Sequence, residues 1–496
     1  MTTATPIQLK SYDKLFIGGS WVEPSSDAVI DVISPITGEV IASVPEAREA
    51  DMDRAVAAAR KAFDEGPWPR MTPAERAEAL VRVGDEVKKR IPAMAEAFTL
   101  ELGGPAAIST LFHQNAVDMW DDAATFHERF TFEEERTWKD GRGKVVREPI
   151  GVVAVIVPWN GPVATASLKI SPALAAGCTV VLKPAPEGPV TTMMLAEALE
   201  AAGLPEGVIS VLPAGREVGD HLVGHPDVDK ISFTGSTVAG RTVMTRAAEK
   251  IKRVTLELGG KSAAIIADDI ELDSFLPGMV FGGIGHSGQV CAALTRILVP
   301  RERQDEVVAA IEAVMKSVKV GDPRDPDTFI GPLAAERQQK RVLDYIEIGK
   351  QEGARLVVGG GKPAHLDRGW YVEPTLFADV RNDMRIAQEE IFGPVLSAIP
   401  FKDEAEALSI ANDVQYGLTG YLWTADVTRA FRFTDALQAG MIWVNSENVR
   451  HLPTPFGGVK NSGIGRDGGD WSFDFYMETK NIAFATAPAN IQKLGG

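Results

Sequence analysis

Apolar residues recur at helical spacing in two segments near the start of the chain, residues 51–66 and 72–104. In the second segment Thr72 is followed three residues later by Glu75, which is the pattern of a capping box at a helix N-terminus. A pair of glycines closes the same segment, as glycine often does at the end of a helix. The pattern therefore predicts two amphipathic helices.

From Gly151 onward, short runs of β-branched residues alternate with helical segments. This alternation predicts a parallel sheet covered by helices on both faces. Such sheets bind ligands at the carboxyl ends of their strands. The predicted strands are 151–157, 179–184, 207–213, 230–235 and 253–260, and the helices between them are 164–176, 190–202, 216–223 and 238–250.

A second series of strands and helices begins after Gly260. The two series predict an α/β fold with two Rossmann-like parallel αβα domains, the first from 1–126 and 150–260, the second from 261–460. The strands predicted in the second series are 262–268, 354–361, 395–401, 417–423 and 440–445, with a helix at 304–318.

The segment between the early helices and the first sheet is mostly polar and contains Asp140-Gly141, a hairpin-turn signal. A polar hairpin gains little free energy by folding onto its own core. We therefore expect residues 127–149 to form a small β arm that reaches a neighbouring subunit.

Composition narrows the function classes. The chain has 496 residues and a formal charge of −17, which argues against a nucleic-acid partner because phosphates would be repelled. Two cysteines cannot form a disulfide framework, and we find neither a signal peptide nor an apolar run long enough for a membrane helix. We find no metal-ligand spacing among the histidines. We expect a cytoplasmic protein without a membrane partner or a metal.

Several glycine-rich stretches could hold a phosphate. The two GxGxxG matches, 283–288 and 463–468, do not lie between an apolar strand and a helix, so we interpret them as loop glycines. Thr234-Gly235-Ser236 follows a buried strand and opens a helix, where free N–H groups favour an anion. A plain strand-to-helix turn explains the same residues. Lys183 ends another strand, where it either binds a ribose hydroxyl or lies in solvent.

Cys291 follows Gly288-Gln289 and is either a core residue or a nucleophile, whereas Cys178 lies in an unbroken apolar run that indicates an inert core thiol. Glu257 stands at a strand end before two glycines and could act as a general base or form a salt bridge. Asn160 at another strand end could donate to an oxyanion beside the Cys291 N–H group. Each of these signals is weak when it stands alone.

Taken together, the motifs resemble the NAD(P)-dependent aldehyde dehydrogenase superfamily along nearly the whole chain. They occur in the family's order and spacing: PWN, KPA, FTGS, ELGGK, GQVC, EEIFGP and PFGG. The resemblance implies that Cys291 is the catalytic thiol, Glu257 the general base, Asn160 the oxyanion-hole amide and Lys169 the lysine near it. It also implies that the first domain binds NAD(P) and the second is catalytic.

The resemblance further implies a set of cofactor contacts. Lys183 and Glu390 match ribose-binding residues, Phe392 borders the nicotinamide, Ser236 faces the pyrophosphate, and Gly215 and Gly219 flank the cofactor cleft. The full predicted cofactor set is Ile156, Val157, Pro158, Trp159, Lys183, Pro186, Glu187, Gly215, Gly219, Phe233, Thr234, Gly235, Ser236, Leu258, Gly259, Glu390 and Phe392.

This chemistry does not need a histidine. A cysteine protease needs an imidazole to protonate an amine leaving group. In aldehyde oxidation the thiolate adds to the carbonyl, hydride leaves to the nicotinamide, and a water activated by Glu257 hydrolyses the thioester.

The substrate is predicted from residues around the thiol. Gly161 stands where many relatives carry an aromatic residue, and Thr165 and Leu168 are modest in size, which suggests a roomy pocket. Val290 and Phe456 complete the predicted wall. Residues 444–484 resemble hydroxymuconic semialdehyde dehydrogenases, including the 5-carboxymethyl-2-hydroxymuconate type, in which an Arg at the position of Arg450 binds an anionic group.

Two features of the sequence leave the choice of substrate open. Relatives of that type often carry a second Arg in the helix before the hairpin, where this chain has Trp120 and acidic residues. The first half of the chain looks more like broad-range, terpenoid and aromatic aldehyde dehydrogenases. We predict a bulky semialdehyde or aromatic aldehyde from aromatic catabolism, with a broad-range aliphatic or terpenoid substrate as the alternative.

The cofactor prediction is NAD, with NADP as a second choice. Pro186 stands where NAD-preferring relatives place Glu, but Glu187 follows, and a carboxylate there would repel a 2′-phosphate. The polar hairpin and residues 475–496 resemble the family's subunit-bridging elements, so we expect a homodimer or homotetramer.

Three other functions remain as alternatives. One is a CoA-acylating dehydrogenase, which usually lacks the base that Glu257 supplies. Another is a cofactor-independent thiol esterase, and the third is a structural protein descended from a dehydrogenase.

Overall fold

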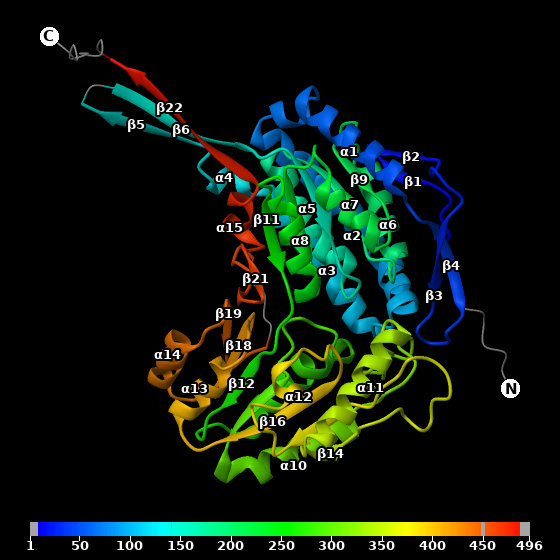
Figure 1. Cartoon of the computed structure of the whole chain (residues 1–496), viewed down its shortest axis with the longest axis vertical. Helices are drawn as coiled ribbons and strands as arrows, with labels where there is room; N and C mark the ends of the chain where they lie inside the picture. The colour runs from blue at the N-terminus through cyan, green and yellow to red at the C-terminus, as the bar shows by residue number, and fades with distance from the viewer. Residues whose placement is uncertain (1–7, 140, 448–451, 487–496) are drawn as a thin grey trace.

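The computed structural model describes residues 8–139, 141–447 and 452–486, which form two αβα lobes and a projecting arm (Figure 1). Among these residues the first lobe contains an eight-stranded sheet in the order β2-β1-β9-β8-β7-β10-β11-β21. The five strands from β9 to β11 pair in parallel, as the sequence predicts, and the outer strands pair antiparallel. The strands are β1 (Leu15–Ile17), β2 (Ser20–Val22), β7 (Val152–Ile156), β8 (Thr179–Lys183), β9 (Ile209–Val211), β10 (Lys230–Thr234), β11 (Arg253–Glu257) and β21 (Gly463–Ile464).

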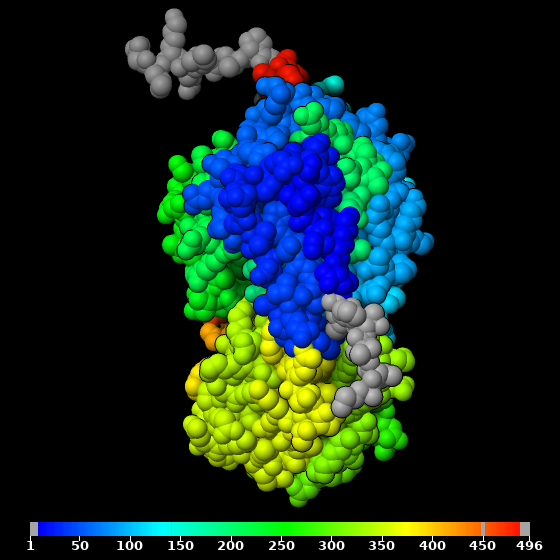
Figure 2. All heavy atoms as spheres, turned by 90° about the vertical axis from the view of Figure 1, so that its right-hand side faces the viewer, coloured from blue at the N-terminus to red at the C-terminus, as the bar shows by residue number. Residues whose placement is uncertain are grey.

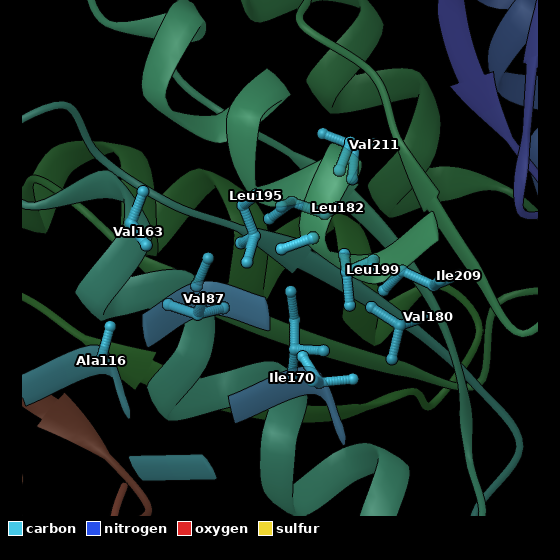
Figure 3. Close-up of a cluster of buried hydrophobic side chains, with 14 of the residues drawn as sticks. Val87, Ala116, Val163, Ile170, Val180, Leu182, Leu195, Leu199, Ile209 and Val211 are labelled. Carbon is cyan, nitrogen blue, oxygen red and sulfur yellow. The ribbon is translucent and has the colours of Figure 1, made fainter. Parts of the chain in front are cut away.

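Alternate side chains of these strands enter two separate cores, because successive residues of a strand point to opposite faces. Val153 and Val155 pack against α2, α3, α5 and α6, in the cluster that Figure 3 shows, whereas Val152 and Ala154 pack against α1, α7 and α8. Both faces of the sheet are therefore buried. The helices are α1 (Glu49–Asp64), α2 (Pro73–Leu102), α3 (Ala106–Ala124), α5 (Pro162–Ala176), α6 (Pro189–Ala201), α7 (Arg216–Gly224) and α8 (Thr237–Ala248).

The capping box predicted at the start of α2 is present. The Thr72 hydroxyl accepts from the Glu75 N–H group at 3.3 Å, and the Glu75 carboxylate accepts from the Thr72 N–H group at 2.7 Å. The helix ends at Gly103, whose φ of 76° is the left-handed conformation that favours glycine.

The second lobe has a seven-stranded sheet in the order β14-β15-β16-β13-β12-β18-β19 among the described residues. Its strands are parallel except β14, which pairs antiparallel with β15. The chain passes from β14 to β15 through a loop without a helix, whereas consecutive parallel strands are usually joined by a helical crossover. The strands are β12 (Ala263–Ile266), β13 (Arg296–Pro300), β14 (Arg355–Val358), β15 (Thr375–Ala378), β16 (Val395–Phe401), β18 (Thr419–Trp423) and β19 (Met441–Val444).

Helices cover this sheet on both faces as well. One core contains side chains of α9 and α10, and the other contains side chains of α11, α12, α13 and α14. These helices are α9 (Leu272–Met279), α10 (Gln304–Ser317), α11 (Glu336–Gln351), α12 (Arg385–Gln388), α13 (Glu404–Asn412) and α14 (Val427–Ala436).

The arm is a three-stranded antiparallel sheet that extends away from both lobes (Figure 1). The predicted polar hairpin supplies β5 (Glu133–Trp138) and β6 (Gly141–Pro149), and β22 (Met477–Ala485) pairs along the whole of β6. Before reaching the arm, the chain returns to the first lobe through β21 and α15 (Gly469–Asp474). Within the described ranges, no helix is both long and apolar enough to cross a membrane.

The N-terminal segment also joins the two lobes. Figure 2 shows it lying over the first lobe and reaching the second. The hairpin of β3 (Val29–Ile33) and β4 (Val40–Pro45) approaches the second lobe, where the Trp370 N–H group donates to the Pro35 carbonyl at 3.0 Å. The hairpin thus adds a contact between the two lobes besides the chain segments that connect them.

Candidate functional site

A cavity of about 430 Å³ lies where the carboxyl ends of β7, β10 and β11 face the second lobe. Its lining brings together most of the residues predicted from the sequence. From the predicted set it contains Pro158, Trp159, Asn160, Thr165, Leu168, Thr234, Gly235, Ser236, Glu257, Leu258, Gly259, Cys291, Glu390, Phe392 and Phe456.

Cys291 lies in a turn that precedes β13 and is half-buried. Gly288, three residues earlier, has a φ of 70°, and a Cβ atom there would come within 2.2 Å of the Gly393 carbonyl oxygen. On the other side, the Tyr421 hydroxyl donates to the Ala292 carbonyl at 2.6 Å. The turn that carries the thiol is therefore held from both sides by the second lobe.

Asn160 is tied directly to this turn. Its side-chain amide donates to the Gln289 carbonyl at 2.9 Å, two residues before the cysteine. The Gln289 side chain in turn accepts from the Ala334 N–H group at 3.0 Å. An amide in this position can also donate to an oxygen atom that forms beside the sulfur.

Glu257 ends β11 and is 5% exposed. The glycines that follow it allow other groups to come close: a Cβ atom on Gly259 would lie 2.4 Å from the Glu390 carboxylate, and one on Gly260 would lie 2.6 Å from the Cys291 carbonyl oxygen. The Gly260 N–H group donates to Glu390 at 3.0 Å. Burial raises the pKa of Glu390, and this hydrogen bond opposes the rise.

The start of α8 forms another part of the wall. Ser236 is the N-cap of this helix, and its hydroxyl accepts from the Ala239 N–H group at 3.2 Å. Gly240 lets the helix pack on β11, because a Cβ atom there would come within 2.5 Å of Leu258. Free N–H groups and the helix dipole therefore make this end of the cavity suited to an anion.

Lys183 is buried at the end of β8 and does not line the cavity. Its ammonium group donates to the carbonyls of Pro184 at 2.9 Å and Ala214 at 2.8 Å, and burial lowers its pKa to about 8. Gly219 leaves room for this side chain, since a Cβ atom there would lie 3.2 Å from it. The other predicted cofactor residues outside the cavity lining are Ile156, Val157, Pro186, Glu187, Gly215 and Phe233.

Leu168 and Phe456 connect this cavity with a second one of about 500 Å³, because both residues line both cavities. The second cavity is mainly apolar. Its other lining residues are Gly440, Met441, Ile442, Trp443, Ser446, Leu452, Thr454, Pro455 and Gly468.

Gly161 and Val290 line neither of these cavities. A Cβ atom on Gly161 would lie 3.6 Å from the Phe112 ring of α3, so an aromatic residue from another helix lies beside this glycine. Arg450, the predicted carboxylate-binding residue, lies outside the described residues.

His286 is the histidine nearest to Cys291 in the sequence. Its ring packs between Phe98 and Phe112, with centroid distances of 5.3 Å and 5.6 Å, and it does not line the cavity. Burial lowers its pKa to about 4, so the ring is neutral at pH 7. It is not placed to take the proton of the thiol.

Lys169 and Asp467 form a buried ion pair at 2.6 Å, with side chains 0% and 2% exposed. The sequence predicts Lys169 near the oxyanion site. It does not predict its partner Asp467, which lines the cavity. The two residues are 298 positions apart, and Asp467 stands in one of the glycine-rich loops. Residues so far apart along the chain leave no local sequence pattern for such a pair.

The first turns of α11 were also missed. Arg337, Gln338 and Arg341 line the cavity, and the Gln338 side chain donates to the Phe392 carbonyl at 2.7 Å. They belong to a strongly polar helix with no motif, which from sequence alone is typical of a solvated surface.

Comparison with known proteins identifies the class. The sequence matches the Aldehyde dehydrogenase family over residues 21–482. It is 44% identical to geranial dehydrogenase from Castellaniella defragrans, over 95% of this chain and 98% of that protein. It is 42% identical to the putative aldehyde dehydrogenase DhaS of Bacillus subtilis, over 96% of each chain.

A solved structure agrees with these matches. The crystal structure of Mycobacterium tuberculosis aldehyde dehydrogenase complexed with NAD+ has a TM-score of 0.93 and 48% identity, covering 95% of this chain and 98% of that one. The protein is therefore an enzyme of the oxidoreductase class. It belongs to the aldehyde dehydrogenase family. The narrower likeness to hydroxymuconic semialdehyde dehydrogenases stays a prediction.

The buried ion pair yields a prediction about stability. Replacing Lys169→Met removes the cation that is hydrogen-bonded to the buried Asp467 carboxylate, so we expect a loss of about 3–5 kcal/mol in the free energy of unfolding. The double variant Lys169→Met/Asp467→Leu removes both charges and should recover most of the loss. Urea and thermal unfolding measure these changes.

A matched control is the exposed pair Lys340–Asp344 on α11. Lys340→Met should change stability by no more than about 1 kcal/mol. An equally small effect of Lys169→Met would contradict the structural importance of the buried pair.

Proposed function

We propose that the protein oxidises an aldehyde to a carboxylic acid with NAD+, through a covalent bond to Cys291. The observation that carries the proposal is that Cys291, Asn160 and Glu257 line one cavity together with the N-terminus of α8. Family membership supports it, as does the NAD+ complex of the Mycobacterium tuberculosis relative.

The residues present fit a dinucleotide. The N–H groups at the start of α8 suit a pyrophosphate, and the buried Glu390 carboxylate on the cavity wall suits a ribose hydroxyl. Trp159 and Phe392 meet edge to face at a centroid distance of 5.5 Å and would border a flat ring. When bound, NAD+ supplies the hydride acceptor.

The chain's own residues perform the remaining steps. The Cys291 thiolate adds to the aldehyde carbon, and the new oxyanion accepts hydrogen bonds from the Asn160 amide and the Cys291 N–H group. After loss of hydride, the acyl group remains on sulfur as a thioester. Glu257 then takes a proton from water, which attacks the thioester and releases the acid and the thiolate.

Glu257 on the cavity wall also favours water over coenzyme A as the acyl acceptor. Its carboxylate is positioned at the same cavity as the sulfur, where a base can activate a small nucleophile. A cofactor-independent esterase would leave the anion-suited end of α8 without a role.

We predict that Glu257→Gln separates the two half-reactions. Its steady-state rate should fall about 10²–10⁴-fold, while a burst of one NADH per active thiol remains, because only thioester hydrolysis needs the base. Stopped-flow absorbance at 340 nm measures the burst.

Cys291→Ser should abolish both the burst and the steady-state phase. Cys178→Ser, at a buried thiol outside the cavity, is the control and should leave both phases unchanged. Undiminished oxidation by Cys291→Ser would refute the mechanism.

For the substrate we propose a bulky apolar aldehyde. The second cavity, which meets the first at Leu168 and Phe456, is lined by Met441, Ile442 and Trp443 among others. Its volume of about 500 Å³ exceeds what a two-carbon aldehyde would fill. The geranial dehydrogenase relative supports a terpenoid aldehyde.

A second candidate is a semialdehyde of aromatic catabolism that carries a carboxylate. The resemblance of residues 444–484 and the presence of Arg450 favour it, because an Arg fork binds a carboxylate in a bidentate manner.

The choice is tested with matched aldehydes. We expect wild-type kcat/KM to be higher for geranial and benzaldehyde than for 4-carboxybenzaldehyde, and Arg450→Ala to leave this order unchanged, because the described wall is apolar. A preference for 4-carboxybenzaldehyde that Arg450→Ala abolishes would favour the semialdehyde.

We also propose a homodimer or homotetramer joined through the arm. Trp138 and Phe484 on the arm are 46% and 62% exposed, so this projecting sheet offers apolar surface that a partner chain can cover. We expect a molar mass of two or four chains by light scattering, and a shift toward the monomer in Trp138→Lys/Phe484→Lys. An unchanged mass in this variant, with native circular dichroism, would contradict the arm's role.

A further inference from the structure

An ion pair joins the two lobes beside the cavity. Arg337, in the first turn of α11, contacts Glu187, which lies in the loop between β8 and α6. The Glu187 side chain is 19% exposed and that of Arg337 is 63% exposed. Arg337 also lines the cavity proposed for the dinucleotide, whereas Glu187 does not.

The position of Glu187 has a meaning in this kind of sheet. β8 is the neighbour of β7 on the side away from β10, and it is thus the second strand of the doubly wound unit. In such folds an acidic residue after the second strand holds the ribose 2′-hydroxyl of NAD, and a nearby Arg accommodates the 2′-phosphate of NADP. Here both types of residue are present and contact each other.

The ion pair between Arg337 and Glu187 changes the repulsion of a 2′-phosphate that the sequence predicts. A free carboxylate at Glu187 would repel a 2′-phosphate, but the Arg337 guanidinium compensates its charge. Pro186, just before it, carries no charge. A second guanidinium, that of Arg341, lines the same cavity and donates to the Glu390 and Ile391 carbonyls. The two guanidinium groups therefore make this side of the cavity compatible with the 2′-phosphate of NADP.

We infer that Arg337 determines cofactor selectivity and allows the enzyme to use NADP+ beside NAD+. With NAD+ bound, Arg337 stays on Glu187. With NADP+ bound, the guanidinium exchanges Glu187 for the 2′-phosphate, which a planar fork can bind with two N–H groups. This inference rests on the proposed function, since it concerns the cofactor of the same cavity.

The test compares kcat/KM for NADP+ and NAD+ with one aldehyde. Arg337→Gln should lower the value for NADP+ about tenfold and leave that for NAD+ within about twofold, a moderate effect because the side chain is exposed. Arg337→Lys, which keeps the charge but not the fork, should lie between. Glu187→Gln should raise the NADP+/NAD+ ratio, because it removes the repelling charge and releases Arg337.

The control is Arg355→Gln, which breaks an exposed ion pair with Asp379 away from the cavity and should leave the ratio unchanged. The KM for NADP+ should also rise more steeply with ionic strength than the KM for NAD+.

Two results would overturn the inference. The first is that the wild type does not reduce NADP+ at millimolar concentration. The second is that Arg337→Gln lowers kcat/KM equally for both cofactors, which would indicate that the Arg337–Glu187 pair only holds the two lobes together. In both cases NAD+ would still be reduced. Absence of turnover with either cofactor would instead count against the proposed function.

Discussion

The close approach of the two lobes at the end of β11 is the constraint on which the site depends. Gly259 and Gly260 carry no side chain, so the Glu390 carboxylate and the Cys291 backbone come within contact distance of this strand end. A methyl group at either position would collide with one of them. The hydrogen bond from the Asn160 amide to the Gln289 carbonyl spans the same interface and depends on this approach.

The same approach explains how a thiol can be used here without an imidazole. The sulfur lies on a turn fixed by Gly288 on one side and by the Tyr421 hydroxyl on the other, while His286 is enclosed by aromatic rings. Among the polar groups that line the cavity are the Asn160 amide, which follows β7, and the Glu257 carboxylate, which ends β11. They suit addition to a carbonyl followed by attack of water, in which no amine has to be protonated.

Much of this arrangement could be predicted from the sequence because its signals are local. Strand-and-helix alternation indicated both sheets, and the residues at the strand ends, such as Asn160 and Glu257, line the cavity as expected. What could not be predicted depends on contacts between distant segments. Asp467 meets Lys169 only after the chain returns from the second lobe, and Phe112 reaches the space beside Gly161 from α3. The antiparallel β14 and the cavity face of α11 likewise depend on how the chain passes between elements.

The return of the chain through β21 also constrains the order of events during synthesis. The first sheet gains its last strand, and Lys169 its counter-ion, only from residues made after the entire second lobe. Since translation proceeds from the N-terminus, a nascent first lobe leaves the ribosome with an open sheet edge and an uncompensated lysine. The cavity thus cannot be completed before the second lobe has been made and the C-terminal segment has docked.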